Sequence, residues 1–205
     1  MNMTELAWAS FNQAIEDYHL TDHVDAEPQN PFPNDSLEQI LYAKNWIDTV
    51  QWHLEDLIRD ENISCDKALV LKRRIDASNQ KRTDLVEHLD GWFLHKFRNV
   101  VPDSFAKINT ETPAWALDRF SILALKVYHM AAEANRTTAT EEHRVKCQQK
   151  LEVLLQQKQD LSTAIEQLLA DIENGKVKIK VYHQMKMYND ESLNPILYQN
   201  QKNGQ

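Results

Sequence analysis

The chain has 205 residues, of which 42% are hydrophobic, 26% are charged and three are glycine, and its formal net charge is −8. This length suffices for one sizeable core, and we expect a single helical-bundle domain over residues 1–205, with residues 200–205 frayed. Scarce glycine disfavours folds with many tight turns. The negative charge disfavours nucleic acid as a partner.

Nothing in the sequence indicates a membrane or secreted protein. No run of eighteen apolar residues occurs, so we expect no membrane span. The start "MNMTELAWAS" lacks a basic segment followed by an apolar block, so we expect no secretory signal. Cys65 and Cys147 lie far apart, which is typical of reduced thiols. The sequence therefore predicts a cytoplasmic protein.

Apolar residues at steps of three and four predict an all-α fold, a bundle of about five long helices. The predicted helices lie near residues 3–19, 36–60, 64–97, 113–135 and 140–174. Their boundaries are set by candidate N-caps and by one terminating glycine, which are Asp35 or Ser36, Ser64, Thr112 before Pro113, and Gly175. Between the first two helices, the prolines of "DAEPQNPFPND" predict a loop.

The last long helix carries a coiled-coil-like seam that contains one lysine. The seam consists of Leu151, Leu154, Lys158, Leu161, Ile165, Leu168 and Ile172. Because this seam must be covered, we expect a homodimer, unless the N-terminal helix and the tail cover it within one chain. Val177, Ile179 and Val181 alternate as in a strand, but with no second strand to pair we expect a short helix or an extended arm. Its apolar residues predict that 182–198 docks on the body.

The stretch "NWIDTVQWHLED", residues 45–56, is unusually rich in polar and aromatic side chains for a helix. On a helical wheel the apolar side collects Trp46, Ile47, Val50, Leu54, Leu57 and Ile58. The other side collects Asn45, Asp48, Thr49, Trp52, Glu55, Asp56, Arg59 and Asp60, with His53 at the border. Three interpretations remain open, namely a solvated face, a buried polar seam between helices, and a ligand or metal site. Because large aromatics seldom face water alone, Trp52 favours burial.

Other predicted helices supply partners for such a seam. Asn79 and Arg82 lie in line with apolar residues of the third helix, so they must be paired or reach solvent. We expect Asp56 to be the acid that pairs with Arg82, and Asp48 to be the second choice. The candidate ligand-binding residues are Asn45, Asp48, Trp52, His53, Asp56, Asn79, Arg82, Asp118 and Arg119.

Metal ligands are a further interpretation of the same faces. His129 and Glu133 lie four residues apart on the fourth predicted helix, a spacing that places an imidazole and a carboxylate on one face. The candidate metal ligands are His53, Asp56, His129 and Glu133. No cofactor is otherwise predicted, because the chain has no glycine-rich phosphate loop, no nucleophile elbow and no C-x-x-C pair.

The motifs "NWIDTVQWHLEDLIRD", "IDASNQKRTDLVEHLD", "ETPAWALDRFSILALKVYHM" and "KMYNDESLNPILY" resemble an uncharacterised bacterial family of helical proteins. This family is number four thousand two hundred and fifty-four among the domains of unknown function. The resemblance covers nearly the whole chain and implies a bacterial cytosolic helical protein, without an activity. Trp46, His53 and Asp56 also resemble a pattern in DinB-like metal-binding four-helix proteins, in which one helix carries a tryptophan, then a histidine, then an aspartate three residues further on. The later histidine pair of those proteins is absent, and His129 with Glu133 is the nearest substitute.

Two functions from different classes follow. The chain is predicted to be a self-assembling or partner-binding module, supported by the seam and the long helices. The alternative is an enzyme that binds a metal or a phosphorylated ligand through His53, Asp56, Arg82, Asp118 and His129. All-helical nucleoside triphosphate pyrophosphohydrolases offer a weaker similarity, because Glu87 and Asp90 look like half of their magnesium motif, whereas Asp56 and Asp60 depart from the other half.

Overall fold

The computed structural model describes residues 1–185, 190 and 192–203, which contain six helices and two short strands. The helices are α1 (Met3–Thr21), α2 (Leu37–Ile58), α3 (Cys65–Lys96), α4 (Pro113–Asn135), α5 (Glu141–Glu173) and α6 (Pro195–Asn203). The strands are β1 (Lys107–Ile108) and β2 (Val177–Lys178). The five long helices begin and end within a few residues of the predicted bounds. The predicted all-α class is confirmed.

Each long helix begins at a side chain that accepts a hydrogen bond from the backbone N–H three residues further on. These N-caps are Asn2, Ser36, Ser64, Thr112 and Thr140. Such a bond satisfies one of the four backbone donors that a helix start leaves unpaired. Pro113 follows the Thr112 cap, where its missing N–H removes no helical bond. Local chemistry thus fixes where the helices start.

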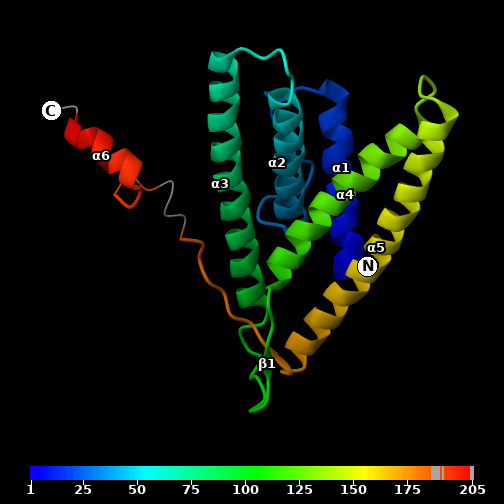
Figure 1. Ribbon diagram of the computed structural model, residues 1–205. Coiled ribbons are helices and arrows are strands. Elements are labelled where there is room, and N and C mark those ends of the chain that lie inside the picture. Colours follow the sequence, from blue (N-terminus) through cyan, green and yellow to red (C-terminus); the bar gives the residue numbers. More distant parts are fainter. Residues whose placement is uncertain (186–189, 191, 204–205) are drawn as a thin grey trace.

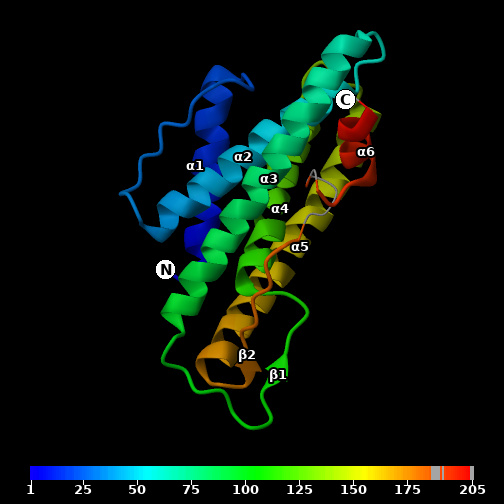
Figure 2. The same ribbon diagram turned by 90° about the vertical axis from the view of Figure 1, so that its left-hand side faces the viewer.

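Three helices form a layer, and a helical hairpin packs across it (Figures 1 and 2). α2 packs against α1 on one side and α3 on the other, and α4 contacts all three. The long loop of residues 22–36 returns the chain to the start of α2, so α1 and α2 run in the same direction (Figure 2). α4 and α5 form the hairpin. As a result, the C-terminal halves of α1, α2 and α4 lie at the same end of the bundle (Figure 1).

One apolar core joins the layer to the hairpin. Phe11, Leu41, Leu89 and Phe120 are fully buried and come from α1, α2, α3 and α4. Burying one such side chain contributes about 1.5–3 kcal/mol relative to leaving it exposed. Burial of these residues therefore holds the four helices together.

The seam on α5 is covered in part within the chain. Ile165 and Ile172 are buried in the common core, mainly against α4. The ammonium group of Lys158 lies 4.0 Å from the ring centre of Trp8 on α1, a geometry that stabilises a cation on an aromatic face. Partial burial lowers the pKa of this lysine. The lysine in the predicted seam thus has a partner in its own chain, and the homodimer stays a prediction.

The prediction that no strand could pair with residues 177–181 was wrong. Val177 and Lys178 pair in parallel with Lys107 and Ile108, which lie in the loop between α3 and α4. Gly175 allows this approach because its φ of +72° is left-handed and a Cβ there would lie 2.9 Å from the carbonyl oxygen of Val101. A two-residue strand in a loop has no periodicity to reveal it in the sequence.

The tail contacts the body through its first residues. His183 Nδ1 lies 2.7 Å from a carboxylate oxygen of Glu87, whose other oxygen accepts the backbone N–H of Gln184. Among the described elements, α6 packs against none, and in Figure 1 it stands apart from α3. Met187 and Tyr188 lie outside the described residues, so docking of residues 182–198 stays a prediction.

α6 extends to Asn203, and 204 and 205 lie outside the described residues, so fraying of residues 200–205 stays a prediction. None of the helices in the described part of the chain is long and apolar enough to cross a membrane.

Candidate functional site

A buried polar seam centres on Asp48 in the middle of α2. One of its carboxylate oxygens accepts hydrogen bonds from Lys44 Nζ at 2.5 Å and from Ser121 Oγ at 2.6 Å. The other accepts from Arg82 Nε on α3 at 2.5 Å. Lys44, Asp48 and Ser121 are all buried. A buried carboxylate needs such donors, because moving its charge out of water is unfavourable.

Asp118 on α4 completes the seam. Its carboxylate lies 2.7 Å from Lys44 Nζ and 3.4 Å from Arg82 Nη2. Two cations therefore face two anions, and their formal charges sum to zero. The side chain of Asn45 donates to Ser121 Oγ at 2.9 Å, which ties the same turn of α2 to α4. The seam thus fixes the relative positions of α2, α3 and α4.

Arg82 pairs with acids as predicted, but not with the first choice. Burial lowers the pKa of Arg82, and the nearby Asp48 and Asp118 carboxylates outweigh burial and raise it. Asp56 is exposed, and its carboxylate lies 3.9 Å from His53 Nδ1 and not at Arg82. The reason is that α2 and α3 form a hairpin closed by residues 59–64. Arg82 lies far from that turn, so it faces the middle of α2 and not its end.

The other predicted seam residues divide into two groups. Asn79 Oδ1 accepts from Gln51 Nε2 at 2.9 Å and from Arg82 Nη1 at 3.3 Å, so Asn79 belongs to the seam. Arg119 is exposed and pairs with Glu111 at 3.0 Å, so it does not. Leu57 was expected on the core side of α2 but is 48% exposed. The predicted burial of the polar face thus holds for its first two turns and fails towards the end of α2.

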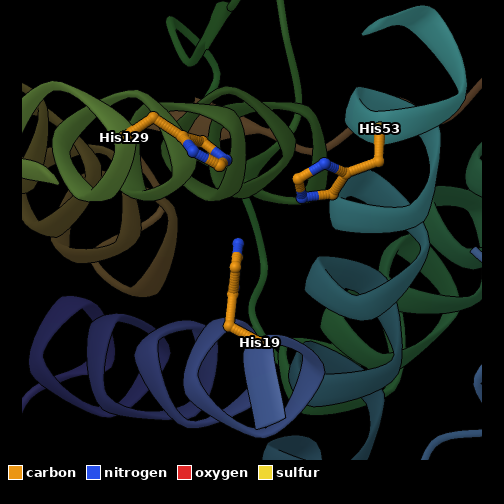
Figure 3. A group of neighbouring side chains, drawn as sticks. All are labelled: His19, His53 and His129. Atoms are coloured by element: carbon orange, nitrogen blue, oxygen red, sulfur yellow. The ribbon is translucent and has the colours of Figure 1, made fainter. Parts of the chain in front are cut away.

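Three histidines from three helices meet at the end of the bundle where α1, α2 and α4 converge (Figure 3). His19 is in the last turn of α1, His53 is on α2, and His129 is on α4. One nitrogen of each ring lies within 4.8 Å of the corresponding nitrogens of the other two. The rings point toward one another across the space between the helices (Figure 3).

Hydrogen bonding indicates which ring nitrogens are available in this cluster. His19 Nδ1 lies 2.7 Å from the carbonyl oxygen of Ile15, which can only accept, so Nδ1 carries the proton. His53 Nδ1 faces a carboxylate oxygen of Asp56 at 3.9 Å. The Nε2 atoms of His53 and His129 are buried without a hydrogen-bond partner in the described structure. Histidines that bind metals commonly hold one nitrogen on a carbonyl or carboxylate and use the other as the ligand.

The local electrostatics keep the rings of His53 and His129 uncharged at neutral pH. Burial lowers the pKa of His53, and the neighbouring His19 lowers it further. Burial, His53 and His19 together lower the pKa of His129 to about 4. Asp22 and Asp56 oppose these shifts but do not reverse them. Neutral imidazole is the form that binds metal ions.

Aromatic side chains stack on the rings of His53 and His129. Tyr18 stacks on His53 with ring centres 5.0 Å apart, and Trp52 stacks on His129 at 4.9 Å. The Tyr18 pKa is raised to about 12, mainly by burial, so this neighbour stays neutral. A ligand set that is held by packing loses less freedom when a metal binds.

The geometry is near that of a zinc site but more open. Zinc binds imidazole nitrogen at about 2.0–2.1 Å, so three tetrahedral ligands lie about 3.3 Å from one another. The present separations are up to 4.8 Å, so the three rings would have to move closer together around a bound ion. Asp22 and Asp56 lie near enough to influence the rings, and either a carboxylate or water could complete the coordination.

The cluster differs from the predicted metal ligands. His53 and His129 meet as predicted, with Asp56 beside His53. Glu133 points elsewhere and bonds to Arg136 and to His143 Nε2 at 2.8 Å. The sequence interpretation missed His19, because no spacing rule connects it to the other two histidines.

The paired acids Glu87 and Asp90 take separate roles. Glu87 binds the tail, whereas Asp90 is buried, and burial is the main cause that raises its pKa. Asp56 and Asp60 were compared with the other half of the magnesium motif of the pyrophosphohydrolases. They lie on the C-terminal part of α2 and just beyond it. The described structure thus gives the acids of the pyrophosphohydrolase outline no common site.

Comparison with known proteins identifies a family but not an activity. No curated protein and no solved structure matches the chain. A family model described as "Protein of unknown function (DUF4254)" matches residues 38–181, which is well over half of the chain. The matched range contains the polar seam, His53 and His129, and it begins after His19. The resemblance found in the sequence motifs is thereby confirmed, and the chain belongs to the DUF4254 family.

Proposed function

We propose that the protein binds a divalent transition-metal ion, zinc in the first instance, through the Nε2 atoms of His19, His53 and His129. The observation that carries this proposal is the convergence of three imidazoles from three helices, two of them with buried Nε2 atoms that have no hydrogen-bond partner among the described residues. Three imidazoles with a fourth position for water are typical of catalytic zinc sites, where the ion acts as a Lewis acid. The proposed activity is therefore metal-assisted hydrolysis of a small molecule.

The chemistry of the donors supports this class of metal. Imidazole nitrogen suits zinc, copper, nickel and iron, whereas magnesium and calcium prefer oxygen ligands. Asp22 and Asp56 add negative charge beside the cluster, which favours a cation. The predicted ligand Glu133 is not part of the proposal, because it is bound to His143 and Arg136.

Titration of the metal-free protein with zinc, against a chromophoric chelator of known affinity, tests the proposal. We expect one tightly bound zinc per chain and a loss of at least tenfold in affinity for His129→Ala, as for removal of one of three ligands. His88→Ala is the matched control, because His88 is an exposed histidine on α3. Equal zinc affinity in the two variants would refute the site.

A second candidate function is assembly with another protein or with a second copy of the chain. Its support is α6, which exposes Ile196 (70%) and packs against no other described element. An isolated amphipathic helix of this length is marginal in water and gains stability from a partner. Light scattering tests self-assembly: a mass near 24.0 kDa at micromolar concentration would exclude a stable homodimer.

A cytoplasmic location is proposed on the basis of the cysteines. Cys65 and Cys147 are both free thiols. Free thiols are usual in reducing compartments, whereas oxidising compartments favour disulfides. Fractionation of cells that express the protein would test this location directly.

A further inference from the structure

We propose that the pocket between α2, α3 and α4 binds a small organic amine in its protonated form. This inference goes beyond the proposed metal site and does not depend on it. The pocket has a volume of about 310 Å³ and is lined by residues that include Gln51, Trp52, Asp56, Arg82 and Leu125. A volume of this size is at the lower end of the range for small-molecule sites.

Gln51 supplies a hydrogen-bond acceptor whose orientation is fixed by its neighbours. Arg82 can only donate, so the Asn79 atom 3.3 Å from its Nη1 must be oxygen. The same oxygen lies 2.9 Å from Gln51, which must therefore direct its amide nitrogen at Asn79. Gln51 Oε1 is left buried without a partner in the described structure, in a side chain that is only 9% exposed. Buried acceptors are rarely left unpaired, so a donor on a ligand would satisfy it.

The charges around the pocket leave one carboxylate without an arginine or lysine partner in the part of the chain that the structure describes. Arg82 is neutralised in the seam by Asp48 and Asp118. The second arginine in the lining, Arg59, pairs with Glu55 at 3.5 Å. Asp56 is the third acid in the lining, and His53 Nδ1 lies 3.9 Å from its carboxylate, beyond hydrogen-bond distance. The lining thus keeps a formal charge of −1 at Asp56, which favours a cation over an anion.

The remaining walls suit a cation that carries an apolar group. Trp52 stacks on His129 and also lines the pocket, and tryptophan is the aromatic side chain that attracts cations most strongly. Ile122 and Leu125 provide apolar surface opposite the polar groups. A protonated amine in this pocket would offer donors for Gln51 Oε1 and positive charge for Asp56, with its hydrocarbon part against these walls.

Three ligands of nearly the same shape test the charge preference. Benzylamine is cationic at pH 7, benzyl alcohol is neutral and benzoate is anionic. Their binding to the metal-free protein, in the presence of a chelator, can be followed by tryptophan fluorescence and by NMR line broadening. We expect benzylamine to bind at least tenfold more tightly than benzyl alcohol, as for a hydrogen bond to a charged group, and benzoate to bind weakest.

Variants then locate the site. Gln51→Leu and Asp56→Asn should each weaken benzylamine binding roughly fivefold to tenfold, while Glu61→Gln, an exposed acid outside the pocket lining, should leave it unchanged. Circular dichroism confirms that each variant is folded.

Several outcomes would overturn the proposal. Tighter binding of benzoate would assign the pocket to anions through the two arginines. Equal binding of all three ligands, or no saturation by any of them, would leave no specific amine site. Variants that match the control would place binding elsewhere. Because the assay excludes metal, none of these outcomes bears on the histidine cluster, and failure of zinc binding leaves the amine proposal intact.

Discussion

Arg82 of α3 donates from Nε to the carboxylate of Asp48 on α2 across 2.5 Å, and the same carboxylate holds the fully buried Lys44. This relationship makes one aspartate the common partner of two cations. The contribution of Asp48 to stability follows from the charges that its removal would leave unpaired. Without Asp48, Lys44 and Arg82 would share only Asp118, and one positive charge would be buried without compensation.

Replacing Asp48 should therefore destabilise the protein strongly. We expect Asp48→Ala to lower the free energy of unfolding by about 3–5 kcal/mol, as for other buried ion pairs that lose one partner. Asp56→Ala should change it by less than about 0.5 kcal/mol, because Asp56 is exposed and lies outside the seam. Urea denaturation of metal-free protein measures both values. Similar values for the two variants would show that the seam does not contribute as described.

Gly91 and Gly175 offer a second matched pair of variants, because one lies within a helix and the other in a turn. Gly175→Ala should destabilise the protein by about 1–2 kcal/mol or more, because the residue has φ +72° and a Cβ would lie 2.9 Å from Val101 oxygen. Gly91→Ala, within α3 and with no atom within 4 Å of its new Cβ, should stabilise it by about 0.5–1 kcal/mol. Opposite shifts in melting temperature are expected, and a loss of stability for Gly91→Ala would contradict this account.

The histidine cluster should make stability depend on pH in a defined window. The pKa of His129 is lowered from 6.5 to about 4, so between these values the unfolded chain binds a proton that the folded chain does not. The free energy of unfolding should thus fall as the pH falls from about 6.5 towards 4, and His129 should contribute nothing above this window. Because the ring is only partly buried, the expected loss is about 1–2 kcal/mol.

Comparison with a variant isolates this effect from the titration of carboxylates. His129→Gln removes the titrating ring and keeps a polar side chain of moderate size. Urea denaturation of metal-free protein at pH 7.5, 5.5 and 4.5 should show a smaller decline for the variant than for the wild type. Parallel declines would mean that His129 does not carry the lowered pKa.

Zinc should stabilise the folded protein through His19 as well as through the other two histidines. At a free zinc concentration one hundred times the dissociation constant, ligand linkage predicts a gain of about 2.7 kcal/mol in the free energy of unfolding. His19→Ala should abolish most of this gain. His23→Ala is the control, since His23 is an exposed histidine beyond the end of α1. An equal zinc effect in both variants would remove His19 from the site.

The sequence was sufficient for those parts of the fold that depend on neighbouring residues. Ser36, Ser64 and Thr112 were predicted as helix caps because capping is a local hydrogen bond between residues three apart. The termination of α5 by Gly175 was predicted for the same reason. The pairing of β1 with β2 was not, because it depends on two loops that meet only after the helices have packed.

In the candidate site, too, the contacts that depend on how the helices pack were not predicted from the sequence. Lys44 was missed because a single lysine beside an asparagine carries no sign of burial, although its spacing of four from Asp48 places both on one face. His19 was missed because its meeting with His53 and His129 depends on how α1 packs against α2 and α4. Arg82 was predicted to need an acid, but the choice between Asp48 and Asp56 depended on the register of the α2–α3 hairpin.

Crystals of the protein grown with one equivalent of zinc, measured at the zinc absorption edge, test the central proposal most directly. We predict one anomalous peak, at about 2.0–2.1 Å from the Nε2 atoms of His19, His53 and His129. A crystal of the His129→Ala variant prepared in the same way should lack that peak. No peak between the three rings in the wild type, or a peak only at another group such as His143 with Cys147, would contradict the proposed metal centre.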